Sequence, residues 1–205
     1  MPIVFYTARM SSATPVACAL RELDVPHERV EMDLSRGETR TQEHAARNPN
    51  CKVPVLVVDG TPMFEALAIL VWLGDRYGVE RGLWPAPGAP ERLTALSWTT
   101  WAYVTYGSTI QRANWAGSPR APAELRSPVH AEHALREAQG LLGIFGTWLG
   151  NKPYILGGSF TLADLVVGSV IAYGRICGAS VDGHANVKAW LDRVMERPAV
   201  RAEWS

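Results

Sequence analysis

The pattern of hydrophobic and polar positions changes character partway along the chain. In its first part, continuous apolar runs over residues 3–7 and 55–58 are typical of buried strands. Alternation over residues 27–34 is typical of a strand with one buried face. Apolar residues at helical spacing over residues 13–23 and 67–73 predict two helices.

The order of these elements predicts a mixed sheet. Asp59 and Gly60 form the dipeptide typical of a two-residue turn with positive φ, and they join the third strand to a fourth over residues 61–64. Pro62 cannot donate to a strand ladder, so the fourth strand is expected at an edge. A short polar helical segment precedes the hairpin. The order βαβαββα therefore predicts a four-stranded α/β domain over residues 1–78.

The second part of the chain shows helical spacing only. Residues 79–90 are rich in Gly and Pro and are expected to form a linker, and residues 91–205 are expected to form an all-helical domain. The segment 165–176 carries few polar residues and is predicted to be the buried central helix. Thr161 and Asp164 fit a capping box in front of it, so we predict that they form a structural cap.

Composition and charge restrict the classes of function. Lys plus Arg and Asp plus Glu are equal at 20 each, which argues against nucleic acid or an anionic membrane as a partner. The three Cys residues are widely spaced and give neither a metal site nor a disulfide framework, so no metal and a reducing cytoplasm are expected. The start of the chain lacks the pattern of a signal peptide, and no apolar run reaches the roughly 20 residues of a membrane helix.

Two features near the predicted hairpin suggest a binding site. A cis bond between Val53 and Pro54 would leave the backbone N–H and C=O of Val53 facing outward, where an extended peptide can pair with them. Glu65 and Ala66 open a helix, and a helix N-terminus attracts a carboxylate. A trans proline in a surface loop and an ordinary helix start are the alternative interpretations.

In this order and spacing, the motifs resemble those of the glutathione transferase superfamily. The segment Arg9-Met10-Ser11-Ser12 is similar to the loop of the serine-type members, of phi and theta style, and can also be aligned with beta-like bacterial members. The resemblance implies a thioredoxin-like N-terminal domain that binds glutathione as a co-substrate. It also implies a helical domain with an apolar pocket, and a homodimer. The motifs that carry it are residues 48–54, 64–69, 157–164 and 197–199.

The resemblance also implies roles for single residues. Val53 would pair with the cysteinyl part of glutathione just before a cis Pro54, Glu65 and the N–H of Ala66 would hold the γ-glutamyl end, and Lys52 would meet the glycyl carboxylate. Family members usually carry Ser or Thr where this chain has Ala66. One hydrogen bond to a charged group is then lost, worth roughly 1.5–3 kcal/mol, so weaker glutathione binding is expected unless another residue compensates.

Thiol activation would require a hydroxyl donor beside the sulfur. The thiolate is the nucleophile, and an ordinary cysteine thiol has a pKa of about 8.5. Alignment of Met10-Ser11 with the phi-like pattern favours Ser11, whereas counting back from Leu20 favours Ser12, and we retain both with a preference for Ser11. Either serine is also a suitable N-cap of the following helix.

The predicted function is that of a glutathione transferase acting on small hydrophobic electrophiles. A non-catalytic interaction module, which the loss of the hydroxyl at Ala66 favours, is one alternative, and a glutathione-dependent isomerase, dehalogenase or peroxidase is another. Aromatic residues at helical spacing are often core residues, but the first long helix of the second domain offers candidates for an electrophile pocket. These are Tyr103, Tyr106, Arg112 and Trp115.

Overall fold

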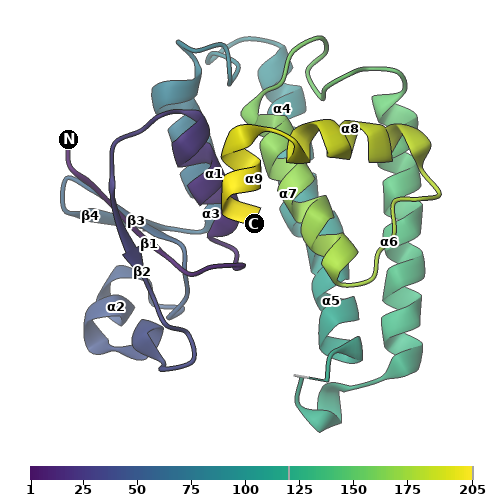
Figure 1. The fold of residues 1–205 in the computed structure, drawn as a ribbon, viewed down its shortest axis with the longest axis horizontal. Helices are drawn as coiled ribbons and strands as arrows, with labels where there is room; N and C mark the ends of the chain where they lie inside the picture. Colours follow the sequence, from purple (N-terminus) through teal and green to yellow (C-terminus); the bar gives the residue numbers. More distant parts are fainter. Residues whose placement is uncertain (120, 205) are drawn as a thin grey trace. The chain divides into compact units, whose positions relative to one another are not determined.

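The computed structural model describes residues 1–119 and 121–204. The chain folds as two compact units, traced in Figure 1. The first unit consists of residues Met1–Ala89 and Glu196–Ser205, and the second of residues Pro90–Met195. The assignment of residues 1–78 to glutathione binding, 79–90 to a linker and 91–205 to a helical domain remains a proposal about function.

A four-stranded sheet forms the centre of the first unit, in the order β2-β1-β3-β4. Strand β1 (Ile3–Thr7) is parallel to β2 (Glu28–Glu31) and antiparallel to β3 (Val55–Val58). Strand β4 (Thr61–Phe64) pairs with β3 at the edge of the sheet. The mixed sheet and the edge position of β4 confirm the prediction. Both residues of the turn between β3 and β4 have positive φ, as the sequence of that turn predicts.

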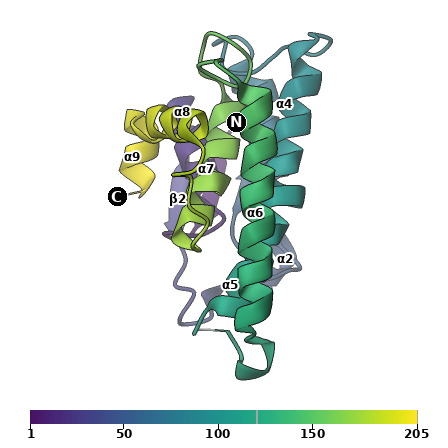
Figure 2. The same cartoon turned by 90° about the vertical axis from the view of Figure 1, so that its right-hand side faces the viewer.

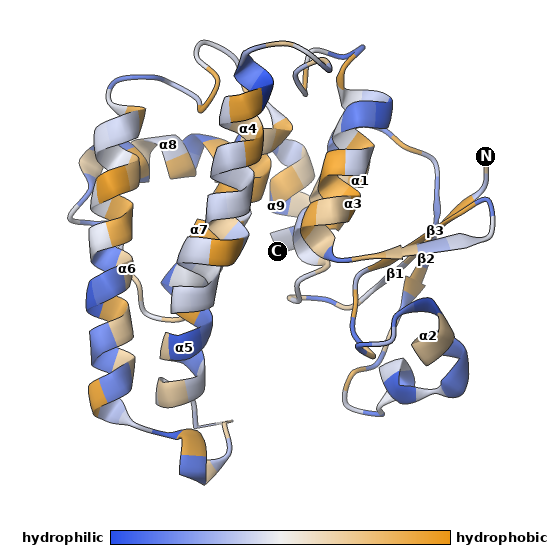
Figure 3. Ribbon diagram, turned by 180° about the vertical axis from the view of Figure 1, so that it is seen from behind, coloured by the Kyte–Doolittle hydropathy of each residue, from blue (hydrophilic) through white to orange (hydrophobic). Residues whose placement is uncertain are grey.

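Helices of the first unit cover both faces of this sheet. Figure 1 shows α1 and α3 together on one side and α2 on the other, and Figure 3 shows β3 and α3 as mostly hydrophobic. Their bounds are α1 Thr14–Glu22, α2 Gln42–Arg47, α3 Ala66–Leu73 and α9 Pro198–Trp204, with a 3₁₀ turn at Glu38–Arg40 and a π-helical turn at Gly74–Gly78.

Helix α9 differs from the sequence prediction, which placed the whole segment 91–205 in the helical domain. It packs against α1 and so belongs to the first unit. Arg197, just before α9, pairs with Glu22 at the end of α1. Pro198 is the first residue of α9, a position at which a helix tolerates proline. Local periodicity could not predict this packing because the partners are far apart in the sequence.

Glu203 is the residue of α9 that forms the most ion pairs with the rest of the first unit. Its carboxylate lies 3.1 Å from Arg21 and 2.7 Å from Arg29, and its side chain is only 8% exposed. Burial raises the pKa of this carboxyl, but the hydrogen bonds and charges of Arg29 and Arg21 outweigh burial and hold the pKa below its ordinary value. The charged form therefore stabilises the fold at neutral pH.

Replacing Glu203 by Gln is expected to lower the free energy of unfolding at pH 7 by about 1 kcal/mol, a modest value because Arg21 is half exposed. A carboxylate with a lowered pKa contributes stability above its unfolded pKa and loses it as the pH falls through the folded pKa. The difference in the free energy of unfolding between variant and wild type should therefore become smaller in acid. Urea unfolding at several pH values measures it. Glu28→Gln, at an exposed position of β2, is the control and should change little. A difference that does not depend on pH would contradict the prediction.

Within its described residues, the second unit is built of helices joined by loops, with an isolated β-bridge between Tyr154 and Gly157. A π-helical segment, Trp101–Tyr106, joins α4 to α5 without a break, so the long predicted helix is present with a wider turn in its middle. Figure 2 shows the length of α6, and Figure 3 shows hydrophobic and hydrophilic bands alternating along it. The bounds are α4 Glu91–Thr100, α5 Gly107–Gly117, α6 Pro128–Leu149, α7 Leu162–Ile176 and α8 Ala185–Met195. None of the helices in the described part of the chain is long and apolar enough to cross a membrane.

Helix α7 is the buried centre of the second unit, as predicted, and the capping box of Thr161 and Asp164 is present at its start. Asp164 is 0% exposed. Its carboxylate accepts from the Thr161 N–H at 2.9 Å and hydroxyl at 3.1 Å, from the Ile155 N–H at 2.7 Å, and from Trp190 Nε1 at 2.9 Å. Burial raises the pKa of this carboxyl, while the four donors oppose that rise by stabilising its charged form. The cap therefore ties three separate segments of the unit together.

Candidate functional site

The peptide bond between Val53 and Pro54 is cis, as the resemblance implies. It lies directly before β3, and the Val53 carbonyl accepts a hydrogen bond from the Ser12 hydroxyl at 2.8 Å. Within residues 1–119 and 121–204, no hydrogen bond of the Val53 N–H is found. Val53 therefore has a backbone donor available beside an acceptor that is already in contact with a serine.

The two candidate serines have different surroundings. The Ser11 hydroxyl donates to the Ala8 carbonyl at 2.6 Å and accepts from the Ala13 N–H at 3.1 Å, so it closes a local turn. Ser12 is exposed, and its hydroxyl reaches across to the cis-proline loop. The prediction that Ser11 or Ser12 is the N-cap of α1 is wrong. The N-cap is Ala13, without a side-chain cap, because the turn closed by Ser11 delays the start of the helix.

The first turn of α3 lies at the same end of the hairpin as the cis proline. Val55 pairs with Phe64 at one end of the β3–β4 ladder. Pro54 precedes Val55 and Glu65 follows Phe64, so both residues lie just beyond this end. Glu65 is exposed and is the N-cap residue of α3, and Ala66 is its first residue. The unpaired N–H groups of a helix start therefore lie close to Pro54.

Two residues that were not predicted as site residues, His44 and Asn48, hold the loop before Val53. The Lys52 carbonyl lies 3.0 Å from His44 Nε2 and accepts from Asn48 Nδ2 at 2.8 Å, whereas the Lys52 side chain is exposed. Asn48 belonged to a motif of the resemblance, but His44 gave no signal because its neighbours in the sequence are mostly polar. Only the fold shows that its ring is buried.

Three segments of this site carry unusual backbone conformations. Met10, Cys51 and Glu65 have φ of 51°, 53° and 70°, and they precede the serines, Lys52 and the first residue of α3, respectively. Residues other than Gly, Asn and Asp rarely adopt positive φ, and such conformations cluster at functional sites. The remaining non-glycine residues with positive φ in the described chain are both Asp, which tolerates it. The strain therefore marks the segments that the sequence predicted as the site.

The candidates for the electrophile pocket all lie in the second unit and are not equally available. Tyr106 is 0% exposed, stacks on Trp101 with ring centroids 5.6 Å apart, and has a pKa raised by burial, so it is a core residue and its assignment to a pocket is corrected. Arg112 is held by Glu137 at 2.8 Å. Trp115 is 52% exposed and Tyr103 is half-buried. Trp115 and Tyr103 are therefore the two candidates that keep exposed surface and are not held by Glu137.

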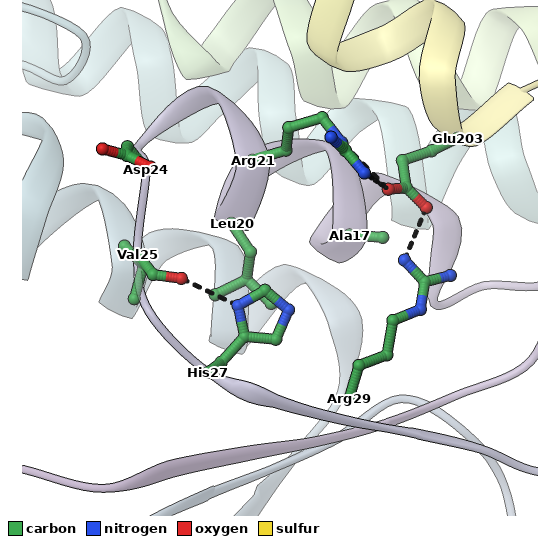
Figure 4. Close-up of a pocket in the computed structure, with 8 residues that line it drawn as sticks. All are labelled: Ala17, Leu20, Arg21, Asp24, Val25, His27, Arg29 and Glu203. Carbon is green, nitrogen blue, oxygen red and sulfur yellow. Dashed lines mark hydrogen bonds and ion pairs between the residues drawn. The ribbon is translucent and has the colours of Figure 1, made fainter.

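A pocket of about 240 Å³ lies elsewhere in the first unit (Figure 4). It contains none of the predicted site residues. Figure 4 shows Arg21 and Arg29 directed at Glu203, so these three charged groups already serve to dock α9. The described residues also contain no cluster of three or more side chains of His, Cys, Asp or Glu suited to a metal ion. The pocket is lined by Ala17, Leu20, Arg21, Asp24, Val25, His27, Arg29 and Glu203.

Comparison with known proteins gives consistent matches along the chain. The family model for the glutathione S-transferase N-terminal domain matches residues 1–75, and that for the glutathione S-transferase C-terminal domain matches residues 112–198. Glutathione S-transferase GstB of Escherichia coli K12 is 29% identical over 188 residues, which cover 91% of this chain and 89% of that protein.

Solved structures agree with these matches. The theta class glutathione S-transferase from Xanthomonas axonopodis pv. citri, with glutathione bound, is 27% identical with a TM-score of 0.85, covering 99% of this chain and 97% of that one. A glutathione transferase homologue from Lodderomyces elongisporus, with two GSH per subunit, has a TM-score of 0.89 at 22% identity and covers 100% of this chain and 98% of that one. At that identity, the second match supports the fold alone.

Proposed function

This chain belongs to the glutathione transferase superfamily, and we propose that it binds glutathione along Val53 and transfers it to small hydrophobic electrophiles. One observation carries the proposal. Within the described residues the Val53 N–H has no hydrogen-bond partner, and the Val53 carbonyl lies 2.8 Å from the Ser12 hydroxyl. A related theta class enzyme has glutathione bound, which supports the choice of ligand.

In this proposal the tripeptide lies extended beside the loop. The backbone of its cysteinyl residue pairs with Val53, its γ-glutamyl carboxylate meets the N–H groups at the start of α3, and its ammonium meets Glu65. Lys52, whose side chain is exposed, meets the glycyl carboxylate. Charged groups of the ligand are thus matched by opposite charges or helix-end donors.

We assign thiol activation to Ser12. Its hydroxyl donates to the Val53 carbonyl, and an approaching cysteinyl N–H would donate to that same oxygen. A carbonyl oxygen has two lone pairs and can accept both donors. A Ser12 hydroxyl that leaves this oxygen to the cysteinyl N–H is free to donate to the sulfur instead. The Ser11 hydroxyl is already engaged twice in its own turn, which supports Ser12 over the preference drawn from the sequence.

Activation converts the thiol to a thiolate, and its proton passes to solvent. The thiolate sulfur then forms a bond to the electrophilic carbon, and with an aryl halide the halide leaves. Titration of the purified protein with glutathione by calorimetry, followed by a conjugation assay with an aryl halide, tests both halves. Binding together with conjugation supports the proposal, and absence of glutathione binding overturns it.

A non-catalytic binding module is the second candidate, and the absence of a hydroxyl at Ala66 favours it. Binding of glutathione without conjugation of any of several aryl halides would favour this candidate over the enzyme. The further parts of the proposal are Tyr103 and Trp115 as contacts of the electrophile, a homodimer, and a cytoplasmic location. Light scattering of the purified protein measures the oligomeric state.

Replacing Ala66 by Ser is expected to tighten glutathione binding about tenfold, because a hydroxyl at the start of α3 adds one hydrogen bond to the γ-glutamyl carboxylate. Calorimetry measures the dissociation constant. Ala68→Ser, an exposed position on the same helix, is the matched control and should leave binding unchanged. Equal affinity of Ala66→Ser and wild type would show that the γ-glutamyl end lies elsewhere.

A further inference from the structure

Two side-chain donors converge on one backbone oxygen next to the proposed glutathione site. His44 Nε2 lies 3.0 Å and Asn48 Nδ2 lies 2.8 Å from the Lys52 carbonyl oxygen. Both donor residues are buried, at 1% and 3% exposure. The Lys52 carbonyl therefore has a fixed direction, toward the interior side of α2.

The direction of this carbonyl determines the direction of the next N–H. The Lys52 carbonyl and the Val53 N–H belong to one planar trans peptide, so they point in opposite directions. A carbonyl held toward His44 and Asn48 turns the Val53 N–H away from them. We propose that His44 is a positioning residue that aims the Val53 N–H at the cysteinyl carbonyl of glutathione, an inference that rests on the proposed function.

The position of the proton on the His44 ring supports a role beyond packing. A carbonyl only accepts, so Nε2 must carry the proton, and in the neutral ring Nδ1 is then an acceptor. Nδ1 is buried and has no hydrogen-bond partner within the described chain. A buried acceptor without a partner destabilises a fold. An apolar ring of the same size would avoid that penalty but would lose the bond from Nε2 to the Lys52 carbonyl, so this bond is what the histidine supplies beyond packing.

The orientation of the ring is set by its own surroundings. The backbone N–H of His44 donates to Thr41 Oγ1 at 3.2 Å, in the first turn of α2, and the ring lies edge-on to Tyr6 with centroids 6.0 Å apart. Asn48 has additional structural roles, because its side-chain oxygen accepts from the Asn50 N–H at 3.0 Å. His44 is therefore the cleaner position for a test.

The test compares His44→Phe with His44→Gln by calorimetry with glutathione. Phe keeps the ring contact with Tyr6 and removes the donor, whereas the amide of Gln reaches about as far as Nε2. Loss of one hydrogen bond is expected to weaken glutathione binding about three- to tenfold in His44→Phe. His44→Gln should bind within about twofold of wild type. The value of kcat at saturating glutathione should not change, because the donor acts on binding.

His27→Phe is the matched control. His27 also places a ring nitrogen near a backbone carbonyl, with Nδ1 2.8 Å from Val25, and its ring lies edge-on to Phe5 in the same unit. It should bind glutathione as wild type does. If His44→Phe does not fold, His44→Asn replaces it, since its shorter amide cannot reach the Lys52 carbonyl and it should bind more weakly than His44→Gln.

A second measurement reports the geometry directly. The ¹⁵N–¹H resonance of Val53 should shift on adding glutathione in the wild type, and shift less in the variant without the donor. Equal affinities of wild type and His44→Phe, or equal losses in His44→Phe and His44→Gln, would overturn the inference and leave the proposed function intact. A wild-type protein that does not bind glutathione would overturn both.

Discussion

Replacing Asp164 by Ala is expected to lower the free energy of unfolding by about 3–5 kcal/mol. The carboxylate is 0% exposed and accepts four hydrogen bonds, from the backbone N–H groups of Ile155 and Thr161, the Thr161 hydroxyl and the Trp190 indole. Its removal leaves these donors buried without partners, and each unsatisfied group is worth about 1–3 kcal/mol. The four losses are not additive, because the donors are neighbours and a water can replace part of the carboxylate.

Urea unfolding followed by tryptophan fluorescence measures this effect. Asp164→Asn, which keeps one acceptor oxygen but adds a donor facing other donors, should lie between wild type and Asp164→Ala. Asp192→Ala, whose carboxylate forms an exposed pair with Lys188 on α8, is the control and should change the free energy of unfolding by about 0.5 kcal/mol or less. A loss below about 1 kcal/mol in Asp164→Ala would show that the cap is not central to the unit.

The cap of α7 was predictable because all of its signals are local. Thr161 and Asp164 are three residues apart, and the apolar helix follows at once. The strands were predictable for the same reason, as was the turn at Asp59 and Gly60, whose composition favours positive φ. The contribution of Trp190 to the cap was not predictable, because no local pattern relates a residue of α8 to the start of α7.

The candidate site shows where sequence patterns stop being informative. The choice between Ser11 and Ser12 depends on a shift of one residue, which the sequence leaves open and the hydrogen bonds of the two hydroxyls separate. His44 lies in a mostly polar segment, and its burial results from how α2 packs. Tyr106 shows the opposite error, since an aromatic residue at helical spacing was assigned to a pocket and lies in the core. In each case the deciding contact joins separate parts of the fold.

The Ser12 hydroxyl contacts the cis-proline loop, whereas the Ser11 hydroxyl closes its own turn. Ser12 is therefore the residue whose replacement should affect the proposed chemistry most. Replacing Ser12 by Ala is expected to raise the pKa of the bound glutathione thiol by about 1 to 2, because a hydrogen bond to a charged group is worth about 1.5–3 kcal/mol. At a pH below both pKa values, kcat should fall about 10- to 100-fold, since only the thiolate reacts. The loss should disappear as the pH rises above the raised pKa. The ultraviolet absorbance of the bound thiolate against pH, measured beside kcat, gives both quantities.

Ser11→Ala and Ser12→Thr are the matched controls for this prediction. Ser11→Ala removes a hydroxyl that bonds the Ala8 carbonyl and the Ala13 N–H, so it should lower stability by about 1 kcal/mol and leave the pKa of the bound thiol unchanged. Ser12→Thr keeps the hydroxyl and should retain the wild-type pKa. If Ser11→Ala raises the thiol pKa and Ser12→Ala does not, the hydroxyl preferred from the sequence is the activating one. If neither variant changes it, a serine hydroxyl does not activate the thiol in this protein.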